Sequence, residues 1–219
     1  MTGGRRSAAL ALAGVLSMLS ALAGCSQQTA SPNAAAPSVS SSDSSASAAR
    51  SAAGIPDCSR WSPGAGATAG AAAGRTVVGE KLPEIVLDCL GGDRPVSVRA
   101  AVSGNPRVIN LWASWCRPCR AEALILGQVS DEMSGTVGFL GIDYGERSGA
   151  DGISFARAAG WRYPQLEDPD ARTRAGWGVT GLPVTLLVAG DGTVVKRLDG
   201  AWASADQLRA AIRTDLERS

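Results

Sequence analysis

Two cysteines, Cys116 and Cys119, follow closely after an apolar run, and this arrangement limits the folds that the chain can adopt. The run, residues 108–112, is short and almost wholly apolar, as expected of a strand buried on both faces of a sheet. A helix is predicted to begin near the cysteines. Its packed side is predicted to carry Ala121, Leu124, Ile125 and Val129. The sequence therefore predicts a buried strand, a turn that holds two thiols, and a helix.

Cys116 is the predicted nucleophile of this pair. It lies at or just before the expected start of the helix, where unpaired N–H groups and the positive end of the helix dipole stabilise a thiolate. Arg117 adds positive charge beside it. Cys119, one turn further into the helix, is expected to be less exposed and to resolve the mixed disulfide that Cys116 forms.

The residues around the cysteines carry a resemblance to a known family. The motif at residues 115–119 reads Trp-Cys-Arg-Pro-Cys, and with residues 110–114 before it and Glu122 after it, it resembles the active site of thioredoxin-fold proteins. It is most similar to the membrane-tethered TlpA, ResA and DsbE group, over roughly Val78 to the C-terminus. The resemblance implies an α/β thioredoxin fold with an N-terminal β-hairpin extension and a central αβ insertion, and an oxidoreductase that needs no cofactor.

The apolar pattern beyond Leu82 predicts the remaining elements of this domain. They are a hairpin of residues 85–87 and 96–98, a strand at 137–143, a helix at 152–159, a short element at 165–166, a helix at 171–175, and a hairpin of 184–188 and 193–198. The last helix is expected to start at Ser204, whose spacing to Gln207 predicts a capping box.

Pro183 precedes an apolar run and has two interpretations. It is either the first residue of a strand, a common position for proline, or the matching proline of thioredoxin-like proteins, which is cis and lies against the cysteine pair. The resemblance implies the second interpretation. The backbone of Leu182 would then be free to pair with an extended substrate segment. Trp115, Arg117 and Pro118 complete the expected support of the active site.

Two positions depart from thioredoxin. Asn110 stands where thioredoxin has a buried Asp that assists proton transfer, so that route is absent. Glu122, about one helical turn after Cys119, resembles the acidic residue that tunes the cysteines in the ResA-like group. The alternative is that Glu122 is a solvated first-turn acid favoured by the helix dipole.

The N-terminal part is predicted to be a leader and a tether. Arg5 and Arg6 precede an apolar stretch, residues 8–23, which is too short for a comfortable membrane span and is typical of a cleaved signal. Its end resembles a bacterial lipoprotein box in which Cys25 is lipidated; the alternative is an ordinary signal peptide with an accidental cysteine. The chain is therefore expected at the extracytoplasmic face of the bacterial cell membrane, held there by a lipid anchor.

The composition of the N-terminal part, together with the resemblance of the remainder, predicts four divisions of the chain. They are a signal at residues 1–24, a disordered Ser/Ala-rich tether at 25–54, a stapled loop at 55–77 and a thioredoxin-like domain at 78–219. Removal of residues 1–24 takes away two arginines and no acids, which leaves 19 basic and 20 acidic side chains. This balance indicates no nucleic-acid partner, and partners are expected to be chosen by shape and thiol chemistry.

Cys58 and Cys89 are predicted to form a structural disulfide. Export to an oxidising compartment favours it, and closing a loop of about 32 residues would stabilise the domain by about 3–4 kcal/mol in the chain-entropy model. The Gly/Ala-rich stretch between them has no core of its own. A second redox pair, or half of a metal site, is the alternative.

Two classes of function follow. The first is a thiol:disulfide oxidoreductase that acts on substrate protein thiols and disulfides. The resemblance implies that its preferred task is the reduction of apocytochrome c cysteines before haem attachment, with electrons from a membrane thiol carrier. The alternative is general oxidation or repair of disulfides in exported proteins.

The second class is a non-enzymatic copper-carrier lipoprotein, which the absence of histidine argues against. No metal site is expected, and the protein is expected to be a monomer.

Overall fold

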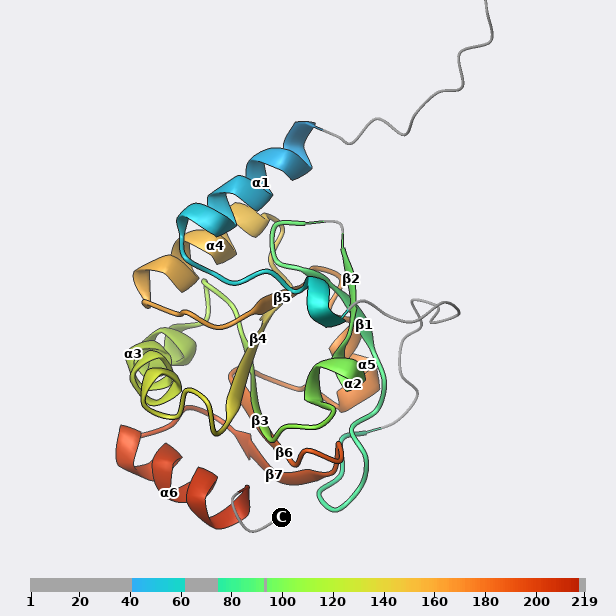
Figure 1. Cartoon of the computed structure of the whole chain (residues 1–219), viewed down its shortest axis with the longest axis vertical. Helices are drawn as coiled ribbons and strands as arrows, with labels where there is room; N and C mark the ends of the chain where they lie inside the picture. Colours follow the sequence, from blue (N-terminus) through green and yellow to red (C-terminus); the bar gives the residue numbers. More distant parts are fainter. Residues whose placement is uncertain (1–40, 62–74, 93, 217–219) are drawn as a thin grey trace, which may run out of the picture. The chain divides into compact units, whose positions relative to one another are not determined.

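A seven-stranded sheet forms the centre of the computed structural model, which describes residues 41–61, 75–92 and 94–216 (Figure 1). The strands lie in the order β2-β1-β5-β4-β3-β6-β7. Their bounds are β1 Val86–Cys89, β2 Pro95–Ser97, β3 Arg107–Trp112, β4 Gly138–Tyr144, β5 Gln165–Asp168, β6 Val184–Val188 and β7 Val194–Asp199. β3, which leads to Cys116, therefore lies in the interior of the sheet.

The pairing of the strands shows how the N-terminal hairpin and β5 join the central strands of the sheet. β3 runs parallel to β4 and antiparallel to β6, and β6 forms a hairpin with β7. β5 pairs parallel with β4 and antiparallel with β1, so it joins the β1–β2 hairpin to the rest of the sheet. The predicted N-terminal hairpin is therefore present. The predicted central insertion is present as well, and consists of α4 (Gly149–Ala158) and β5.

Helices cover both faces of the sheet. Besides α4, they are α1 Ser41–Ala52, the 3-10 helix η1 Ser59–Trp61, α2 Val98–Val102, α3 Arg117–Glu132, α5 Arg172–Trp177 and α6 Ala205–Asp215. α3, α4 and α6 pack on one face, and α2, α5 and η1 pack on the other. Val108 and Trp112 of β3 belong to the first core, and Ile109 and Leu111 to the second. Every residue of β3 is buried because both faces are covered.

A close approach of side chains explains one glycine of β4. Trp112 Nε1 donates a hydrogen bond to Gln165 Oε1 at 3.0 Å. A Cβ atom at Gly141 would overlap that oxygen, so the position has room only for glycine. The hydrogen bond fixes the indole of Trp112, the last residue of β3 before the loop that leads to the cysteines.

The packed side of α3 differs from the prediction. Leu124 is 71% exposed and Ala121 is also exposed, so their predicted burial is wrong. Cys119 and Glu122 face inward instead, and the buried side continues through Leu126. The reason is the helical repeat, which places the residues two and five positions after Cys119 on the opposite side of the helix.

Serine caps decide where two helices begin. β2 ends at Ser97, and Val98, which was predicted to continue the strand, begins α2 because Ser97 Oγ accepts a backbone N–H of the first turn at 3.0 Å. Ser204 Oγ caps α6 in the same way and accepts from Gln207 N at 3.2 Å. Gln207 Oε1 accepts from Ala203 N rather than from Ser204 N, so only one half of the predicted capping box forms.

The helix α1 corrects the predicted tether. It contacts α4 (Figure 1), and Arg50, which is 8% exposed, donates from Nη1 to Leu90 O at 3.1 Å. The prediction of disorder is therefore wrong for residues 41–54, because small side chains and one buried guanidinium hold a segment that has little apolar surface. Residues 1–40, which include the predicted signal and Cys25, lie outside the described residues. In the ranges that are described, no helix has both the length and the apolar character that a membrane span requires.

Candidate active site

Cys116 is the N-cap residue of α3. Its backbone is extended, with φ −77° and ψ 109°, and its Sγ accepts a hydrogen bond from Cys119 N at 3.2 Å. Arg117 and Pro118 follow in the first turn, where a proline is tolerated because its missing N–H would have no helical partner. Cys116 Sγ therefore lies at the N–H groups that begin a 16-residue helix, a position that stabilises a thiolate.

The two sulfur atoms of the motif are joined in a disulfide, with Sγ–Sγ 2.01 Å and Cα–Cα 5.3 Å. Cys116 is 4% exposed and Cys119 is 1% exposed, so Cys116 is the more accessible of the two, as predicted. Trp115 beside them is 61% exposed, and Arg117 and Pro118 are exposed as well. The disulfide thus lies just below a rim of exposed side chains that a protein substrate can contact.

The peptide bond between Leu182 and Pro183 is cis, as the resemblance implied. β6 begins at the next residue, and Leu111 of β3 pairs with Val184 of β6. The cis bond therefore lies at the end of the sheet from which the chain continues to Cys116. Leu182 packs against the core cluster that contains both cysteines of the motif. Within the described ranges no hydrogen bond involves the Leu182 backbone, so its N–H and C=O are open to a partner strand.

Glu122 is fully buried and is held by hydrogen bonds from two other elements. Asn110 Nδ2 donates to Glu122 Oε1 at 2.9 Å, and Trp202 N donates to Glu122 Oε2 at 2.9 Å. Thr185 Oγ1 accepts from Asn110 Nδ2 at 3.2 Å and from Trp202 Nε1 at 3.0 Å. The four residues form one buried network. The alternative of a solvated first-turn acid is therefore wrong for Glu122.

Burial raises the pKa of Glu122 from 4.5 to about 7, although the hydrogen bonds from Trp202 and Asn110 act in the opposite direction. The cause is the low dielectric of the interior, which disfavours the charged carboxylate. Glu122 follows Cys119 by about one helical turn, and residues with this spacing lie on the same face of a helix. A carboxyl that titrates near neutral pH is thus placed on the side of α3 that carries the predicted resolving thiol.

A second carboxyl holds the loop that precedes Cys116. Ser114 N donates to Glu146 Oε1 at 3.0 Å, and the Ser114 hydroxyl donates to the same oxygen. Asp143, at 1% exposure, has no hydrogen-bond partner for either carboxylate oxygen among the described residues. Burial, together with the nearby charge of Glu146, raises the pKa of Asp143 to about 9. The loop of the motif is therefore fixed to the carboxyl end of β4.

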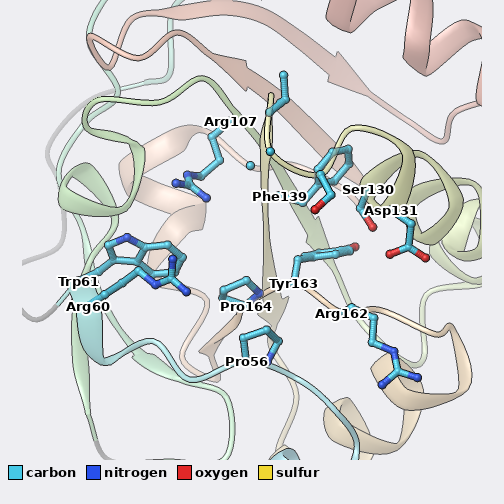
Figure 2. A pocket seen from close by; sticks show the side chains of 14 residues that line it. Pro56, Arg60, Trp61, Arg107, Ser130, Asp131, Phe139, Arg162, Tyr163 and Pro164 are labelled. Carbon is cyan, nitrogen blue, oxygen red and sulfur yellow. The ribbon is translucent and has the colours of Figure 1, made fainter.

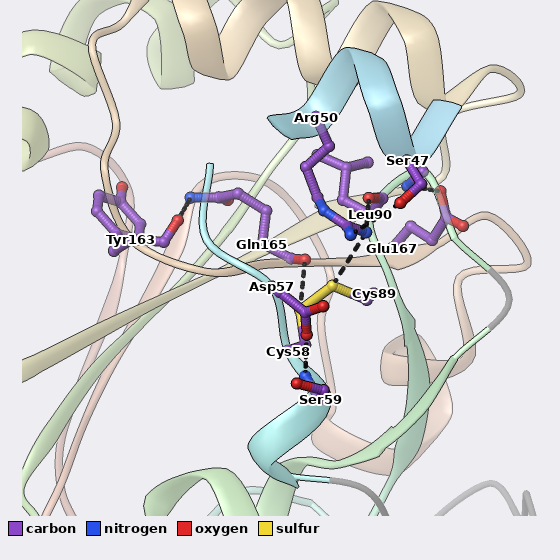
Figure 3. Close-up of a disulfide and its surroundings, with 11 residues drawn as sticks. Ser47, Arg50, Asp57, Cys58, Ser59, Cys89, Leu90, Tyr163, Gln165 and Glu167 are labelled. Atoms are coloured by element: carbon purple, nitrogen blue, oxygen red, sulfur yellow. Dashed lines mark hydrogen bonds between the residues drawn. A yellow bond between two sulfur atoms is a disulfide. The ribbon is translucent and has the colours of Figure 1, made fainter. Parts of the chain in front are cut away.

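Cys58 and Cys89 form a second disulfide, with Sγ–Sγ 2.06 Å and Cα–Cα 5.8 Å (Figure 3). This is the pairing that the sequence predicts. The exposed fractions are 0% for Cys58 and 2% for Cys89, and Arg50 Nη1 lies 3.5 Å from Cys89 Sγ. Both cysteines are buried, and neither lies at the start of an α-helix as Cys116 does.

The residues that sequence reasoning missed are held in place by tertiary contacts. Thr185, Trp202 and Glu146 lie far along the chain from the motif, and their own neighbours give no sign of a site. Asn110 was a local signal, because an amide inside an otherwise apolar strand requires buried polar partners.

Among the described residues, no three His, Cys, Asp or Glu side chains are grouped so as to hold a metal ion.

Known proteins share this arrangement of sequence and fold. Residues 78–197 match the AhpC/TSA family. The thiol:disulfide interchange protein HelX of Rhodobacter capsulatus is 31% identical over 126 residues, which cover 57% of this chain and 69% of HelX. The DsbE homologue of Paracoccus denitrificans is 30% identical over 131 residues, which cover 59% of this chain and 70% of that protein.

A solved structure with a similar fold is that of a secreted disulfide oxidoreductase of Mycobacterium tuberculosis, homologous to Escherichia coli DsbE. It is 27% identical to this chain, with a TM-score of 0.54, and the match covers 59% of this chain and 95% of that one. The thioredoxin fold predicted from the sequence is therefore confirmed.

Proposed function

This chain belongs to the AhpC/TSA family and is a thiol:disulfide oxidoreductase of the thioredoxin fold; we propose that Cys116 and Cys119 are its exchanging pair. The observation that carries the proposal is the position of Cys116 Sγ at the N-cap of α3, where it accepts the Cys119 N–H. In the reduced protein the same N–H groups favour a thiolate at Cys116. Cys116 therefore attacks the substrate, and Cys119 resolves the intermediate.

The exchange proceeds through a mixed disulfide. The Cys116 thiolate attacks one sulfur of a substrate disulfide, forms a bond to it and expels the other sulfur as a thiolate. Cys119 then loses its proton and attacks Cys116 Sγ, which forms the Cys116–Cys119 bond and releases the second substrate sulfur. Two electrons pass to the substrate, and the proton of Cys119 and one from solvent complete its two thiols. The reverse sequence oxidises a substrate dithiol.

Glu122 accepts the proton that Cys119 releases in this scheme and passes it on to the departing substrate thiolate. A general base works best when its pKa is near the working pH, and burial brings the pKa of Glu122 to about 7. Asn110 and Trp202 hold one carboxylate oxygen each, so the carboxyl has a fixed orientation. Glu122 thereby supplies the carboxyl that Asn110 cannot supply.

The substrate binds as an extended segment beside the cis bond. The open N–H and C=O of Leu182 pair with the backbone of that segment, which brings its cysteine to Cys116. Trp115, 61% exposed, offers apolar surface to the side chains next to that cysteine. Affinity then comes chiefly from backbone pairing, which accepts many sequences.

The preferred substrates in this proposal are the cysteines of apocytochrome c, which are reduced before haem attachment. The resemblance of residues 110–122 to the ResA and DsbE group supports this choice. HelX and the DsbE homologue, which are similar to this chain, are thiol:disulfide interchange proteins and support the exchange chemistry. General oxidation or repair of disulfides in exported proteins is the second candidate. The similarity to a secreted disulfide oxidoreductase favours that candidate.

The protein works at the extracytoplasmic face of the cell membrane in this proposal. Residues 1–24 are a signal, Cys25 carries the lipid anchor, and residues 55–77 are a loop stapled to a domain that spans 78–219. The apolar stretch that ends in Leu-Ala-Gly-Cys supports the anchor. A membrane thiol carrier supplies the electrons, and the protein acts as a monomer.

The proposal is tested by trapping the mixed disulfide in cells. In the Cys119→Ser variant the second thiol is missing, so the reaction stops with the substrate bound to Cys116. The Cys116→Ser variant is the matched control and should trap little. Adducts are recovered from membranes under non-reducing conditions and identified by mass spectrometry after reduction.

The trapped partners decide between the candidates. Apocytochromes with a Cys-x-x-Cys-His haem site, together with a membrane thiol carrier, support the cytochrome c function. A wide range of unrelated exported proteins supports general oxidation or repair. If neither variant forms thiol-dependent adducts while the purified protein binds copper stoichiometrically, the exchange function of the pair is refuted and a copper carrier takes its place.

A further inference from the structure

Two arginines that have no acidic partner among the described residues line a pocket at the end of the sheet opposite to Cys116 and Cys119. Arg107 is the first residue of β3 and Trp112 is the last, so about 17 Å of strand separates the pocket from the active-site loop. The pocket has a volume of about 260 Å³. Its wall includes Pro56, Arg60, Trp61, Arg107, Gly138 and Tyr163 (Figure 2).

Both guanidinium groups lie beside the same indole. The distance from Cζ to the ring centre of Trp61 is 5.0 Å for Arg107 and 5.3 Å for Arg60. Figure 2 shows Arg60 and Arg107 on the Trp61 side of the pocket, away from Ser130 and Asp131 on the other side. An aromatic ring attracts cations but carries no net charge. Both positive charges therefore lie next to the same ring, which does not neutralise them.

Arg107 is the buried member of this pair. It is 8% exposed, and its Nε has no hydrogen-bond partner in the part of the chain that the structure describes. Nor does any described carboxylate lie within 4.0 Å of either guanidinium. Residues 1–40 and 62–74 contain no Asp or Glu, and the acidic side chains that the structure does not describe are those of Asp43, Asp93 and Glu217. Burial, with the charge of Arg60, lowers the pKa of Arg107 to about 10. Buried charges in proteins are normally paired, so an anion from outside the chain is expected.

The neighbouring strand makes room for the buried guanidinium. Gly138 is the partner of Arg107 in the parallel register of β3 and β4. A Cβ atom at Gly138 would overlap Nη1 and Cζ of Arg107. The glycine thus leaves room for the guanidinium beside the start of β4, at the wall of the pocket.

We propose that this pocket binds a phosphate group between Arg60 and Arg107. Each guanidinium presents a planar fork of N–H donors, and two forks match the oxygens of a tetrahedral phosphate, whereas one fork already satisfies a carboxylate. Arg162 adds a third positive charge to the lining, and Asp131 is the acid that opposes it. Inorganic phosphate and the headgroup of an anionic phospholipid share this chemistry. The site is separate from the thiol chemistry and leaves it unchanged.

Isothermal titration calorimetry tests the site on the purified full chain in a non-ionic detergent. The probe is sodium phosphate at constant ionic strength, with sodium chloride as the blank. We expect saturable binding of one phosphate, weakened about tenfold or more in Arg60→Gln and in Arg107→Gln, because each variant removes charge-assisted hydrogen bonds. Arg213→Gln is the matched control, since Arg213 is exposed on α6 and its loss changes the net charge equally. Its affinity should equal that of the unmodified protein.

Gly138→Ala is a second kind of test because it keeps every charge. It should weaken phosphate binding several-fold by displacing the Arg107 guanidinium, while circular dichroism and disulfide-exchange rates stay unchanged. If Arg107→Gln does not fold, Arg60→Gln and Gly138→Ala decide the matter. Absence of saturable phosphate binding, or equal affinity in Arg60→Gln and the unmodified protein, would overturn the proposal.

The source of the phosphate is resolved by a soluble phospholipid. Dihexanoyl phosphatidylglycerol, used below its critical micelle concentration, presents the headgroup without a bilayer. Binding tighter than that of inorganic phosphate, and lost in Arg60→Gln, supports a lipid headgroup as the ligand. Binding equal to or weaker than that of inorganic phosphate supports a free phosphate ligand in the same pocket.

Discussion

Asn110 Nδ2 donates a hydrogen bond of 2.9 Å to Glu122 Oε1 and so links the interior of β3 to α3. The remaining members of this network, Thr185 and Trp202, contribute a hydroxyl, a backbone N–H and an indole N–H. None of these groups ionises in the physiological range, so the charge of the network is the charge of Glu122. The protonation state of Glu122 should therefore affect both the free energy of unfolding and the rate of disulfide exchange.

We expect the stability of the protein to depend on pH through Glu122. The folded-state pKa is raised from 4.5 to about 7, so the folded state binds the proton more tightly than the unfolded state. This contribution is present in full below about pH 4.5 and is lost as the pH rises through about 7. The loss amounts to about 3 kcal/mol in the free energy of unfolding, at about 1.4 kcal/mol for each pH unit.

Urea unfolding between pH 4 and pH 8 measures this effect when Glu122→Gln is the reference. The glutamine has the shape of the protonated acid and does not titrate, and other buried acids such as Asp143 cancel in the difference. Relative to Glu122→Gln, the unmodified protein should lose stability over this range. A difference that stays constant with pH would show that Glu122 is not the titrating group.

Asn110→Asp should move the pH dependence of exchange to higher pH. The change places a second carboxyl within about 3 Å of Glu122, and two carboxylates this close cannot both ionise at neutral pH. The pair then keeps one proton above the pKa that Glu122 has alone. The measurement is the rate of insulin reduction against pH, with Asn110→Gln as the uncharged control. If the pH dependence of insulin reduction is unchanged in Asn110→Asp, Glu122 takes no part in the rate-limiting proton transfer.

Removal of the disulfide between Cys58 and Cys89 should reduce stability without slowing exchange. The bond closes a loop with a sequence separation of 31, for which the chain-entropy model predicts about 3–4 kcal/mol. Neither cysteine lies at the start of an α-helix as Cys116 does, so we expect this pair to take no part in turnover. The double variant Cys58→Ser, Cys89→Ser should show a lower melting temperature and a nearly unchanged exchange rate. A large loss of exchange in a still-folded variant would mean that this pair relays electrons.

Arg50 should determine whether α1 stays on the domain. Its guanidinium donates to Leu90 O at 3.1 Å and to Ser47 Oγ at 3.2 Å, and it lies against the Cys89 sulfur (Figure 3). Hydrogen–deuterium exchange should show protected amides in α1 of the unmodified protein and faster exchange there in Arg50→Ala. Protection in α3 should stay unchanged. Rapid exchange of α1 in the unmodified protein would restore the original prediction of a disordered segment.

Local signals account for the parts of the fold and site that the sequence predicts. The apolar run before Cys116 predicts β3, and the spacing of the two cysteines at a helix start predicts the N-cap geometry. The cis bond at Pro183 followed from the resemblance, because nothing in its immediate neighbours distinguishes it from an ordinary strand-start proline.

The remaining parts depend on tertiary contacts that no local pattern reveals. Glu122 was a candidate, but its burial depends on Trp202 and Thr185, which come from distant elements. The apolar character of Leu124 predicts a packed position, but Cys119 and Glu122 are the residues of α3 that face inward. The sequence does not predict α1 because this segment lacks large apolar residues. The buried side chain of Arg50 holds it on the domain instead.

The most direct test of the account is to measure which cysteine of the reduced protein reacts first, and at what pH. Iodoacetamide labelling followed by peptide mass spectrometry gives the alkylation midpoint of Cys116 and Cys119 separately. Because Cys116 caps α3 beside Arg117, we expect it to react first, with a midpoint below the ordinary thiol value of about 8.5. Cys119 should stay largely unmodified in the folded protein. A Cys116 midpoint at or above about 8.5, or faster labelling of Cys119, would contradict the assignment of attacking and resolving thiols.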